Sequence, residues 1–251
     1  MSHKTDIKYA IFTNKGDRPV NEDSAGEIIT PQGSSFFLCD GLGGHGCGDV
    51  ASKLAVATGK ELLEKGVPCN DILKLLFSET QRRILEAQTE NVSQQGMKTT
   101  FNAVLIGKDN IFWGHIGDSR TYRFTRNLWG IKYKRTMDHS VPQLLVNSGR
   151  LKESEIRHHQ DRNRLMKAMG AEWIGEDYEI ESPESVNKPQ AFLMCSDGFW
   201  ELIEESQMIE KLKKAKMPDV WLSQMAEIVT RNGAGKNMDN YTAVAIWVNW
   251  E

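Results

Sequence analysis

The chain has 251 residues, of which 39% are hydrophobic and 26% charged, and its formal net charge is -3. This composition is typical of a folded protein and excludes a disordered chain or a strongly basic nucleic-acid-binding protein. No apolar run approaches the roughly 18 residues of a membrane-spanning helix, and the first residues lead into no signal-peptide core. We therefore expect a cytoplasmic protein with neither nucleic acid nor membrane as a partner.

The cysteines, Cys39, Cys47, Cys69 and Cys195, show no CxxC spacing. Two of them lie in apolar runs, which indicates small buried thiols in a reducing compartment. No low-complexity linker or repeat divides the chain. The sequence therefore predicts one domain that spans residues 1–251.

In chain order, the first predicted elements are strands at residues 7–12 and 35–39, followed by two helices at 49–64 and 70–89. Asn70 is a suitable N-cap for the second helix. Each helix has an apolar stripe at helical spacing, which predicts the face that packs against the rest of the protein. The stripes comprise Val50, Leu54, Ala57, Thr58 and Leu62 in the first helix and Leu73, Leu76, Phe77, Thr80, Ile84 and Ala87 in the second.

Further strands are predicted at residues 101–106, 111–116 and 121–124, joined by turns at 107–110 and 117–119. Such short turns indicate consecutive antiparallel hairpins. A C-terminal helix begins at Pro218 and ends at Asn232-Gly233. The order of elements favours an α+β domain with helices packed outside antiparallel sheets. The remaining predicted strands are 191–195 and 242–248, and the buried face of the C-terminal helix comprises Trp221, Leu222, Met225, Ile228 and Val229.

Acidic residues occur where several predicted strands begin or end. Any one such Asp-Gly or Asp-Asn pair is an ordinary turn, but several together indicate a site if the strand ends converge. Clustered carboxylates at apolar strand ends need a compensating cation, and all-oxygen ligands suit Mg²⁺ or Mn²⁺. The residues concerned are Glu22-Asp23, Asp40-Gly41, Asp118, Asp197 and Asp239.

The glycine-rich segment at residues 41–46 supports a rival hypothesis. It matches GxGxxG, follows a strand and precedes a helix, as in nicotinamide-dependent oxidoreductases. However, Asp40 would repel the pyrophosphate, and the helix is followed by a second helix instead of a parallel strand. We interpret the glycines as allowing close backbone approach to a metal site, with the Gly41 carbonyl available as a ligand.

The ordered set of motifs resembles the metal-dependent Ser/Thr protein phosphatases of the 2C type (the PPM family), in its bacterial branch. The resemblance covers nearly the whole chain and implies a four-layer αββα sandwich of two antiparallel sheets flanked by helix pairs. It is carried by Arg18-Pro19-Val20-Asn21-Glu22-Asp23, Asp40-Gly41-Leu42-Gly43-Gly44-His45, Thr99-Thr100, His115-Ile116-Gly117-Asp118-Ser119-Arg120, Asp138-His139-Ser140, Asn163-Arg164-Leu165, Gly170, Cys195-Ser196-Asp197-Gly198-Phe199-Trp200 and Asp239-Asn240-Tyr241-Thr242.

The resemblance implies hydrolysis of phosphoserine and phosphothreonine in proteins by a metal-activated water at a binuclear Mn²⁺/Mg²⁺ centre. Asp40 would bridge both tightly bound ions, with Asp197 and Asp239 on the first. Asp118, with Asp197, would hold a weaker third ion. The expected partners are phosphorylated substrates of a Ser/Thr kinase, and the protein is expected to be monomeric.

The second ion would be held by Glu22, Asp23 or both, together with the Gly41 carbonyl. Arg18 would bind the substrate phosphate as a bidentate fork. Leu42 occupies the position of the histidine acid of eukaryotic members, so the leaving-group proton must come from elsewhere. A second hypothesis is a non-catalytic member that only binds phosphoproteins, but such members usually lose metal carboxylates, and here each is present.

Other departures from the family pattern concern loops. Lys98 replaces a glycine before Thr99-Thr100, which we expect to change a turn, and His45 is expected to stabilise a loop. His139 and Ser140 are assigned no chemistry, with Ser140 as a helix cap. Residues at about 139–170 correspond to the family's variable flap. Its basic residues either contact a phosphoprotein or form a solvated face; they are Arg157, His158, His159, Arg162 and Arg164.

Overall fold

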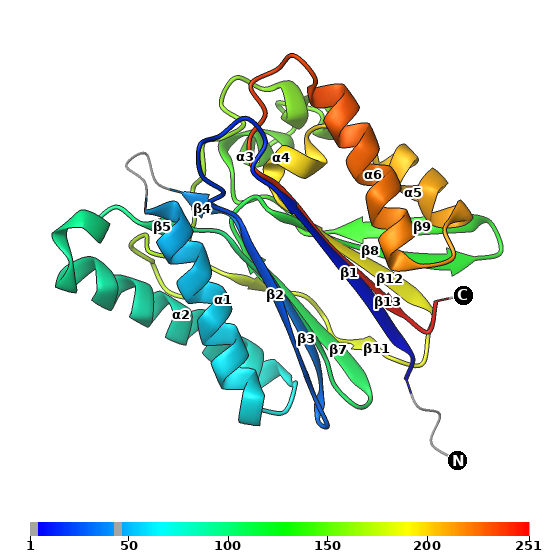
Figure 1. Cartoon of the computed structure of the whole chain (residues 1–251), viewed down its shortest axis with the longest axis horizontal. Helices are drawn as coiled ribbons and strands as arrows, with labels where there is room; N and C mark the ends of the chain where they lie inside the picture. The colour runs from blue at the N-terminus through cyan, green and yellow to red at the C-terminus, as the bar shows by residue number, and fades with distance from the viewer. Residues whose placement is uncertain (1–4, 43–46, 251) are drawn as a thin grey trace.

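The computed structural model describes residues 5–42 and 47–250, and it has two antiparallel β-sheets with helices on both outer faces (Figure 1). This arrangement confirms the expected αββα sandwich. One sheet has the strand order β1-β13-β12-β8-β9. Its strands are β1 (Ile7–Asn14), β8 (Arg120–Asn127), β9 (Gly130–Arg135), β12 (Gln190–Cys195) and β13 (Tyr241–Val248).

The other large sheet has the order β10-β7-β6-β3-β2, with β11 also paired to β7, and a small third sheet pairs β4 with β5. All these pairings are antiparallel. The strands are β2 (Ser24–Thr30), β3 (Gly33–Cys39), β4 (Gly41–Leu42), β5 (Lys98–Thr99), β6 (Phe101–Ile106), β7 (Asn110–Ile116), β10 (Glu179–Ile180) and β11 (Glu184–Ser185).

The central strands are buried on both faces because each has another layer above and below it. In β13 every residue is buried, and its side chains alternate between two apolar clusters. Val244 and Ile246 face the other sheet, whereas Ala243, Ala245 and Trp247 join the cluster beneath the helices. This explains why the strand reads as a continuous apolar run.

The helices form the two outer layers. Helices α1 and α2 cover the sheet that contains β3, and α5 and α6 cover the sheet that contains β13 (Figure 1). The bounds of α6 and its buried face agree with prediction. The helices are α1 (Gly48–Lys65), α2 (Asn70–Glu90), α3 (Val141–Asn147), α4 (Asp197–Trp200), α5 (Glu205–Lys214) and α6 (Pro218–Gly233), with short 3₁₀ turns at η1 (Val92–Gln94) and η2 (Glu153–His158).

Helix α1 buries a different face from the one predicted. Its buried residues include Ala51, Ala55 and Gly59, whereas Val50 is only half-buried, and so are Leu54 and Leu62. A Cβ atom on Gly59 would lie 2.9 Å from the Phe37 ring, so only a small residue allows this close helix–sheet contact. The larger apolar residues pack at the margin of the same cluster.

The N-cap of α2 lies one residue before the predicted position. Cys69 is the N-cap, and its sulfur accepts a hydrogen bond from the Ile72 amide. Asn70 is the first helical residue. The predicted apolar stripe of this helix is confirmed, since Leu73 through Ile84 of the stripe are buried and Ala87 is half-buried.

The segment between β7 and β8 does not form the expected second hairpin. The turn at residues 107–110 joins β6 to β7, as predicted, but β8 belongs to the opposite sheet. Residues Gly117, Asp118 and Ser119 therefore cross from one sheet to the other. Periodicity identifies both strands but cannot tell which sheet each one joins, because strands with mainly buried residues occur in both sheets.

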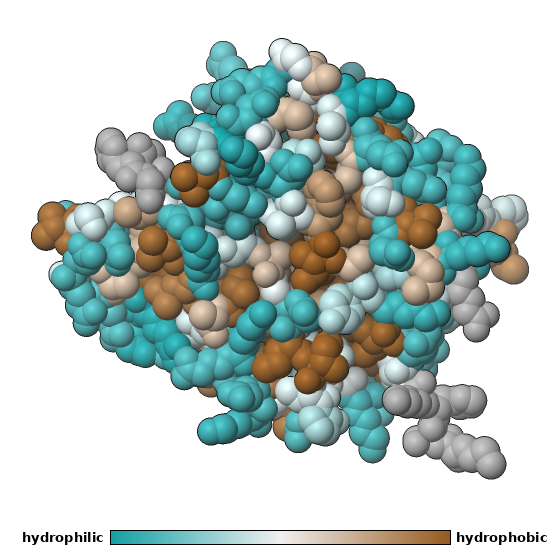
Figure 2. Space-filling model, in the orientation of Figure 1, coloured by the Kyte–Doolittle hydropathy of each residue, from teal (hydrophilic) through white to brown (hydrophobic). Residues whose placement is uncertain are grey.

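The surface in Figure 2 is mainly hydrophilic, with apolar patches over the region where β1 and β2 run in Figure 1. Tyr9 and Ile11 of β1 and Ile29 of β2 are exposed apolar residues of these two edge strands. Within the described ranges, no helix is both long and apolar enough to cross a bilayer.

Candidate metal centre and phosphate site

The strand-end acids meet at one end of the two sheets. Burial raises the pKa of Asp40 well above its usual range, and the nearby charges of Asp23, Asp197, Asp118 and Asp239 raise it further. These residues come from segments next to β2, β3, β7, α4 and β13. The fold thus brings together carboxylates that lie about two hundred residues apart in the chain.

Asp23 and Asp197 are both deeply buried in this cluster. Burial raises the pKa of Asp23 to about 7, although its Oδ2 accepts a hydrogen bond from Ser196 Oγ at 2.8 Å. Within the part of the chain that the structure describes, Asp23 Oδ1 is buried without a hydrogen-bond partner. Burial and the charge of Asp239 raise the pKa of Asp197 to about 6, against the effects of hydrogen bonds with Asp40 and the Gly198 amide.

These carboxylates fit a divalent cation. Buried negative charges that oppose one another, with an unpartnered oxygen on Asp23, leave acceptor capacity that a cation would satisfy. The donors are oxygens only, as Mn²⁺ and Mg²⁺ prefer. A bound cation would reverse the direction of these pKa shifts.

Thr99 and Thr100 hold the backbone of Asp40. Thr100 Oγ1 accepts a hydrogen bond from the Asp40 amide at 2.9 Å, and Thr99 Oγ1 donates to the Asp40 carbonyl at 2.9 Å. Thr100 Oγ1 also bonds to Ser119 Oγ at 2.8 Å, beside Asp118. This explains why the Thr-Thr pair belongs to the motif set, a role that the sequence did not reveal. The neighbouring Lys98 lies in β5 opposite Leu42, in a strand and not in a turn.

Glu22 lies where two glycines bring backbone segments together. Its carbonyl accepts hydrogen bonds from the Gly41 amide at 3.2 Å and from Ser52 Oγ at 2.6 Å. A Cβ on Gly41 would lie 2.3 Å from the Gly48 carbonyl oxygen, and one on Gly48 would lie 2.9 Å from Glu22 Oε1. Burial raises the pKa of Glu22. Of the predicted glycines, Gly41 thus allows close backbone approach.

The fold excludes the oxidoreductase hypothesis. The strand after Asp40, β4, pairs antiparallel with β5, and the large sheets are antiparallel rather than doubly wound. The Gly43-Gly44-His45-Gly46 part of the motif lies outside the described residues, and with it the expected role of His45.

Arg18 lies beside Asp239, with Nη2 donating to Oδ2 at 2.7 Å. Its pKa is raised by this hydrogen bond and by the charge of Asp239. Asn240 holds the loop that carries Arg18: its Nδ2 donates to the Lys15 and Val20 carbonyls, and its Oδ1 accepts from the Glu22 amide at 2.8 Å.

A cavity of about 600 Å³ opens beside this group. Its lining combines acids of the cluster with basic residues of the predicted flap. An open, charged cavity next to buried carboxylates can admit a phosphate group and part of the chain that carries it. The lining includes Arg18, His158, Arg162, Asn163, Asp197 and Asp239.

The flap arginines differ in environment. The Arg157 side chain is about 5% exposed, pairs with Glu205 and donates to the Trp200 carbonyl. Arg157 therefore belongs to the interior framework, contrary to both interpretations of the basic stretch. Arg162 is paired with Glu201 at 3.0 Å and remains partly exposed at the cavity. Ser140 caps α3 as predicted, by accepting from the Gln143 amide.

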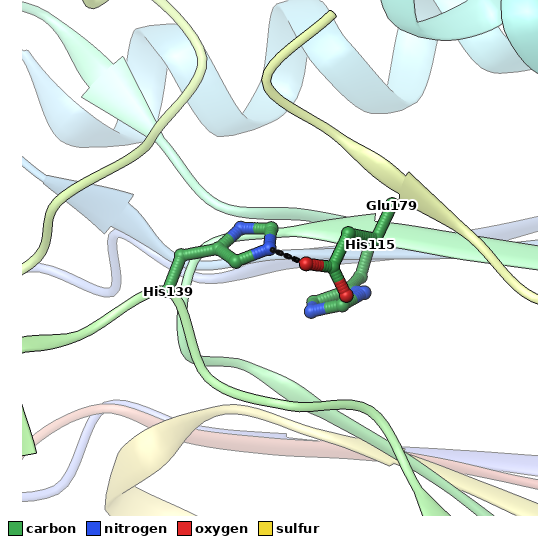
Figure 3. A group of neighbouring side chains, drawn as sticks. All are labelled: His115, His139 and Glu179. Carbon is green, nitrogen blue, oxygen red and sulfur yellow. Dashed lines mark ion pairs between the residues drawn. The ribbon is translucent and has the colours of Figure 1, made fainter. Parts of the chain in front are cut away.

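Near Asp118, His115, His139 and Glu179 form a second group of polar side chains (Figure 3). Among the described residues, this is the group whose ligand atoms lie within 4.8 Å of one another. The His139 Nδ1 atom accepts a hydrogen bond from the Gly117 amide, so the neutral ring carries its proton on Nε2, 3.3 Å from Glu179 Oε1. That tautomer cannot ligate a metal through Nε2.

The antiparallel sandwich with carboxylates at one end is the arrangement expected from the family that the sequence resembles. The sequence model of the family "Protein phosphatase 2C" matches residues 16–241 of the chain. The chain therefore belongs to the protein phosphatase 2C family, and the expectation of a protein phosphatase is confirmed.

Similar proteins come from several bacteria. The chain is 25% identical to "Serine/threonine phosphatase stp" of Listeria monocytogenes, over 98% of this chain and 91% of the relative. It is 30% identical to "Serine/threonine protein phosphatase PstP" of Mycobacterium tuberculosis, over 92% of this chain but 44% of the relative.

Solved structures show the same fold. Serine/threonine phosphatase Stp1 from Staphylococcus aureus has a TM-score of 0.85 at 25% identity, covering 98% of this chain and 97% of that one. The catalytic domain of PstP "in complex with 2 Manganese ions" has a TM-score of 0.81 at 26% identity, covering 98% and 99%.

Proposed function

We propose that the chain hydrolyses phosphoserine and phosphothreonine monoesters in proteins at a binuclear Mn²⁺ or Mg²⁺ centre. The observation that carries the proposal is the convergence of buried acids around Asp40, with Arg18 at the adjacent cavity. Asp40 would bridge both ions, and Asp197 and Asp239 would complete the first site. When bound, these ions supply the positive charge that activates a water molecule and offsets the charge of the phosphoryl group.

Glu22 and the Gly41 carbonyl would hold the second ion, because their backbones already touch. Asp23 accepts a hydrogen bond from Ser196 through Oδ2, and its buried, unpartnered Oδ1 would be satisfied by the same cation. Arg18 would orient the phosphate through its planar fork, and Asp239 keeps that fork at the cavity.

We further propose that residues 1–251 act as a single cytoplasmic, monomeric domain whose substrates are the products of Ser/Thr kinases. Residues 139–170 would serve as the flap, since His158, Arg162 and Asn163 line the cavity. A binding-only protein is disfavoured, because each expected carboxylate is present and the family's motif order is kept.

Removal of metal tests this proposal. Phosphothreonine-peptide hydrolysis should require Mn²⁺ or Mg²⁺ and stop in EDTA, because the carboxylates and Arg18 do not replace the cations that would activate the water. The measurement is phosphate release with Mn²⁺, with EDTA, and with Mn²⁺ restored. Undiminished turnover in EDTA would contradict the proposal.

Asp118→Asn tests the weaker third ion, which we place between Asp118 and Asp197. Asn keeps nearly the same side-chain shape in the crossing segment, so the melting temperature should change little if the residue is merely structural. If Asp118 is a metal ligand, Asp118→Asn should keep two tight Mn²⁺ sites but hydrolyse phosphopeptide at least about tenfold more slowly, as expected for metal-site residues. The loss should be smaller for p-nitrophenyl phosphate, whose leaving group needs little protonation. Wild-type rates on phosphopeptide would leave Asp118 with a structural role in the crossing segment only.

A further inference from the structure

Trp200 holds the backbone of Asp118. Its indole Nε1 donates a hydrogen bond to the Asp118 carbonyl oxygen at 3.0 Å, and both residues are buried. The Arg120 guanidinium carbon lies 3.4 Å from the centre of the Trp200 ring, and Arg157 donates to the Trp200 carbonyl. The indole is therefore fixed by its own contacts, and its N–H can fix the backbone from which the Asp118 carboxylate extends.

His139 holds the preceding residue, Gly117, at two points. The His139 amide donates to the Gly117 carbonyl at 2.9 Å, and His139 Nδ1 accepts from the Gly117 amide at 3.1 Å. Glu179, near His139 Nε2, keeps the ring in the tautomer that can accept (Figure 3). Gly117 has a φ of +104°, and a Cβ there would lie 2.6 Å from Thr100 Cγ2.

Among residues 5–42 and 47–250, the crossing segment has no strand partner and is held in part by these side chains. Glycine adopts positive and negative φ about equally well. Gly117 therefore gives the segment no intrinsic preference for this conformation. His139 holds the residue before Asp118 and Trp200 holds the Asp118 carbonyl, while Ser119 is held by Thr100 and Asn102. Groups behind a metal ligand typically change metal affinity or activity by about 10–100-fold when removed.

We propose that Trp200 and His139 are positioning residues that set the Asp118 carboxylate for binding of the third cation. The inference rests on the proposed function, because it concerns the role given there to Asp118. Neither residue would touch the phosphate or the cation. Their effect should appear in the weak Mn²⁺-binding step and in the reaction that depends on it, and not in the two tighter sites.

Trp200→Phe removes the indole N–H and keeps an aromatic ring. The matched control is Trp221→Phe, because Trp221 is also buried and its Nε1 donates to the Met208 carbonyl at the same 3.0 Å, between α5 and α6. Both variants should lose similar thermal stability. In Trp200→Phe alone, calorimetric Mn²⁺ titration should show the weakest step weakened about tenfold, with phosphopeptide hydrolysis needing about tenfold more Mn²⁺ for half-maximal rate.

Two variants of His139 provide the rescue. Asn places an amide oxygen near the position of Nδ1 and can still accept from Gly117, whereas Leu cannot. His139→Asn should keep the weak Mn²⁺ step, and His139→Leu should lose it as Trp200→Phe does.

The outcomes separate the two levels of the argument. Identical Mn²⁺ titrations for Trp200→Phe and Trp221→Phe would overturn the positioning role, even if the wild type is an active phosphatase. Absence of Mn²⁺-dependent hydrolysis in the wild type would overturn the proposed function. In that case the calorimetric comparison of the variants would still decide whether the two residues control binding at Asp118.

Discussion

Asp40→Asn should reduce phosphopeptide hydrolysis by roughly a thousandfold or more, because the proposed bridging carboxylate serves both ions and several kcal/mol of charge stabilisation depend on them. Steady-state kinetics with saturating Mn²⁺ measures the loss, and calorimetric titration should show both tight sites weakened. Asp109→Asn, at the exposed β6–β7 turn, is the control and should behave as wild type. Two intact tight sites in Asp40→Asn would contradict the bridging role.

The same substitution should stabilise the metal-free protein. Burial and the neighbouring acids raise the pKa of Asp40 above its unfolded value. The folded state therefore holds a proton that the unfolded state releases, and stability falls as pH rises above the unfolded pKa of about 4. In EDTA at pH 8, Asp40→Asn should melt above the wild type, and the difference should shrink at pH 5. A lower melting temperature at pH 8 would show that Asp40 makes a net stabilising contact.

The predicted strands and helices could be found because each has a local pattern, whereas β2, β9 and α5 were not predicted. The strands at β6 and β13 and the helix α6 lie within a residue of expectation, since turn residues and apolar runs mark them. Two features depended on tertiary contacts. β8 joins the opposite sheet because the chain crosses the core after β7. The buried face of α1 is decided by how closely Phe37 approaches Gly59.

The candidate ligands could be found because acids at strand ends are visible in the sequence. Their supporting residues could not be found in that way. Trp200 and Asp118 are 82 positions apart, and nothing in either motif indicates that an indole bonds to that carbonyl. His139 looked like a neighbour of a helix cap. The only sequence signal for Trp200 and His139 was their place in the family motifs. The groups that they contact become apparent once the chain is folded.

Behind the Asp118 segment lies a buried ion pair that also escaped the sequence. Arg120 Nε and Nη2 donate to the two Asp138 oxygens at 2.9 and 2.7 Å, and the side chains are 3% and 1% exposed. Burial alone would raise the pKa of Asp138, but the charge and hydrogen bonds of Arg120, together with the charge of Arg135, outweigh burial and lower the pKa. Arg135 adds a contact to the same carboxylate at 3.3 Å.

Asp138→Asn should therefore destabilise the protein by about 3 kcal/mol, because it leaves the buried Arg120 charge without its main partner. The figure lies at the low end for such pairs because Glu205 remains 3.7 Å from Arg120. The melting temperature should fall by about 6–12 °C in a chain of this size. Since the depressed pKa stabilises only above the unfolded pKa, the gap from the wild type should narrow as pH falls below about 4.

The control is Glu210→Gln, which breaks the exposed pair with Lys214 and should leave the melting temperature unchanged. In the double variant Arg120→Met/Asp138→Leu much of the loss should be recovered, because removing both charges also removes the cost of burying one alone. Equal melting temperatures for Asp138→Asn and the wild type at pH 7 would mean that Glu205 and solvent compensate Arg120 without Asp138.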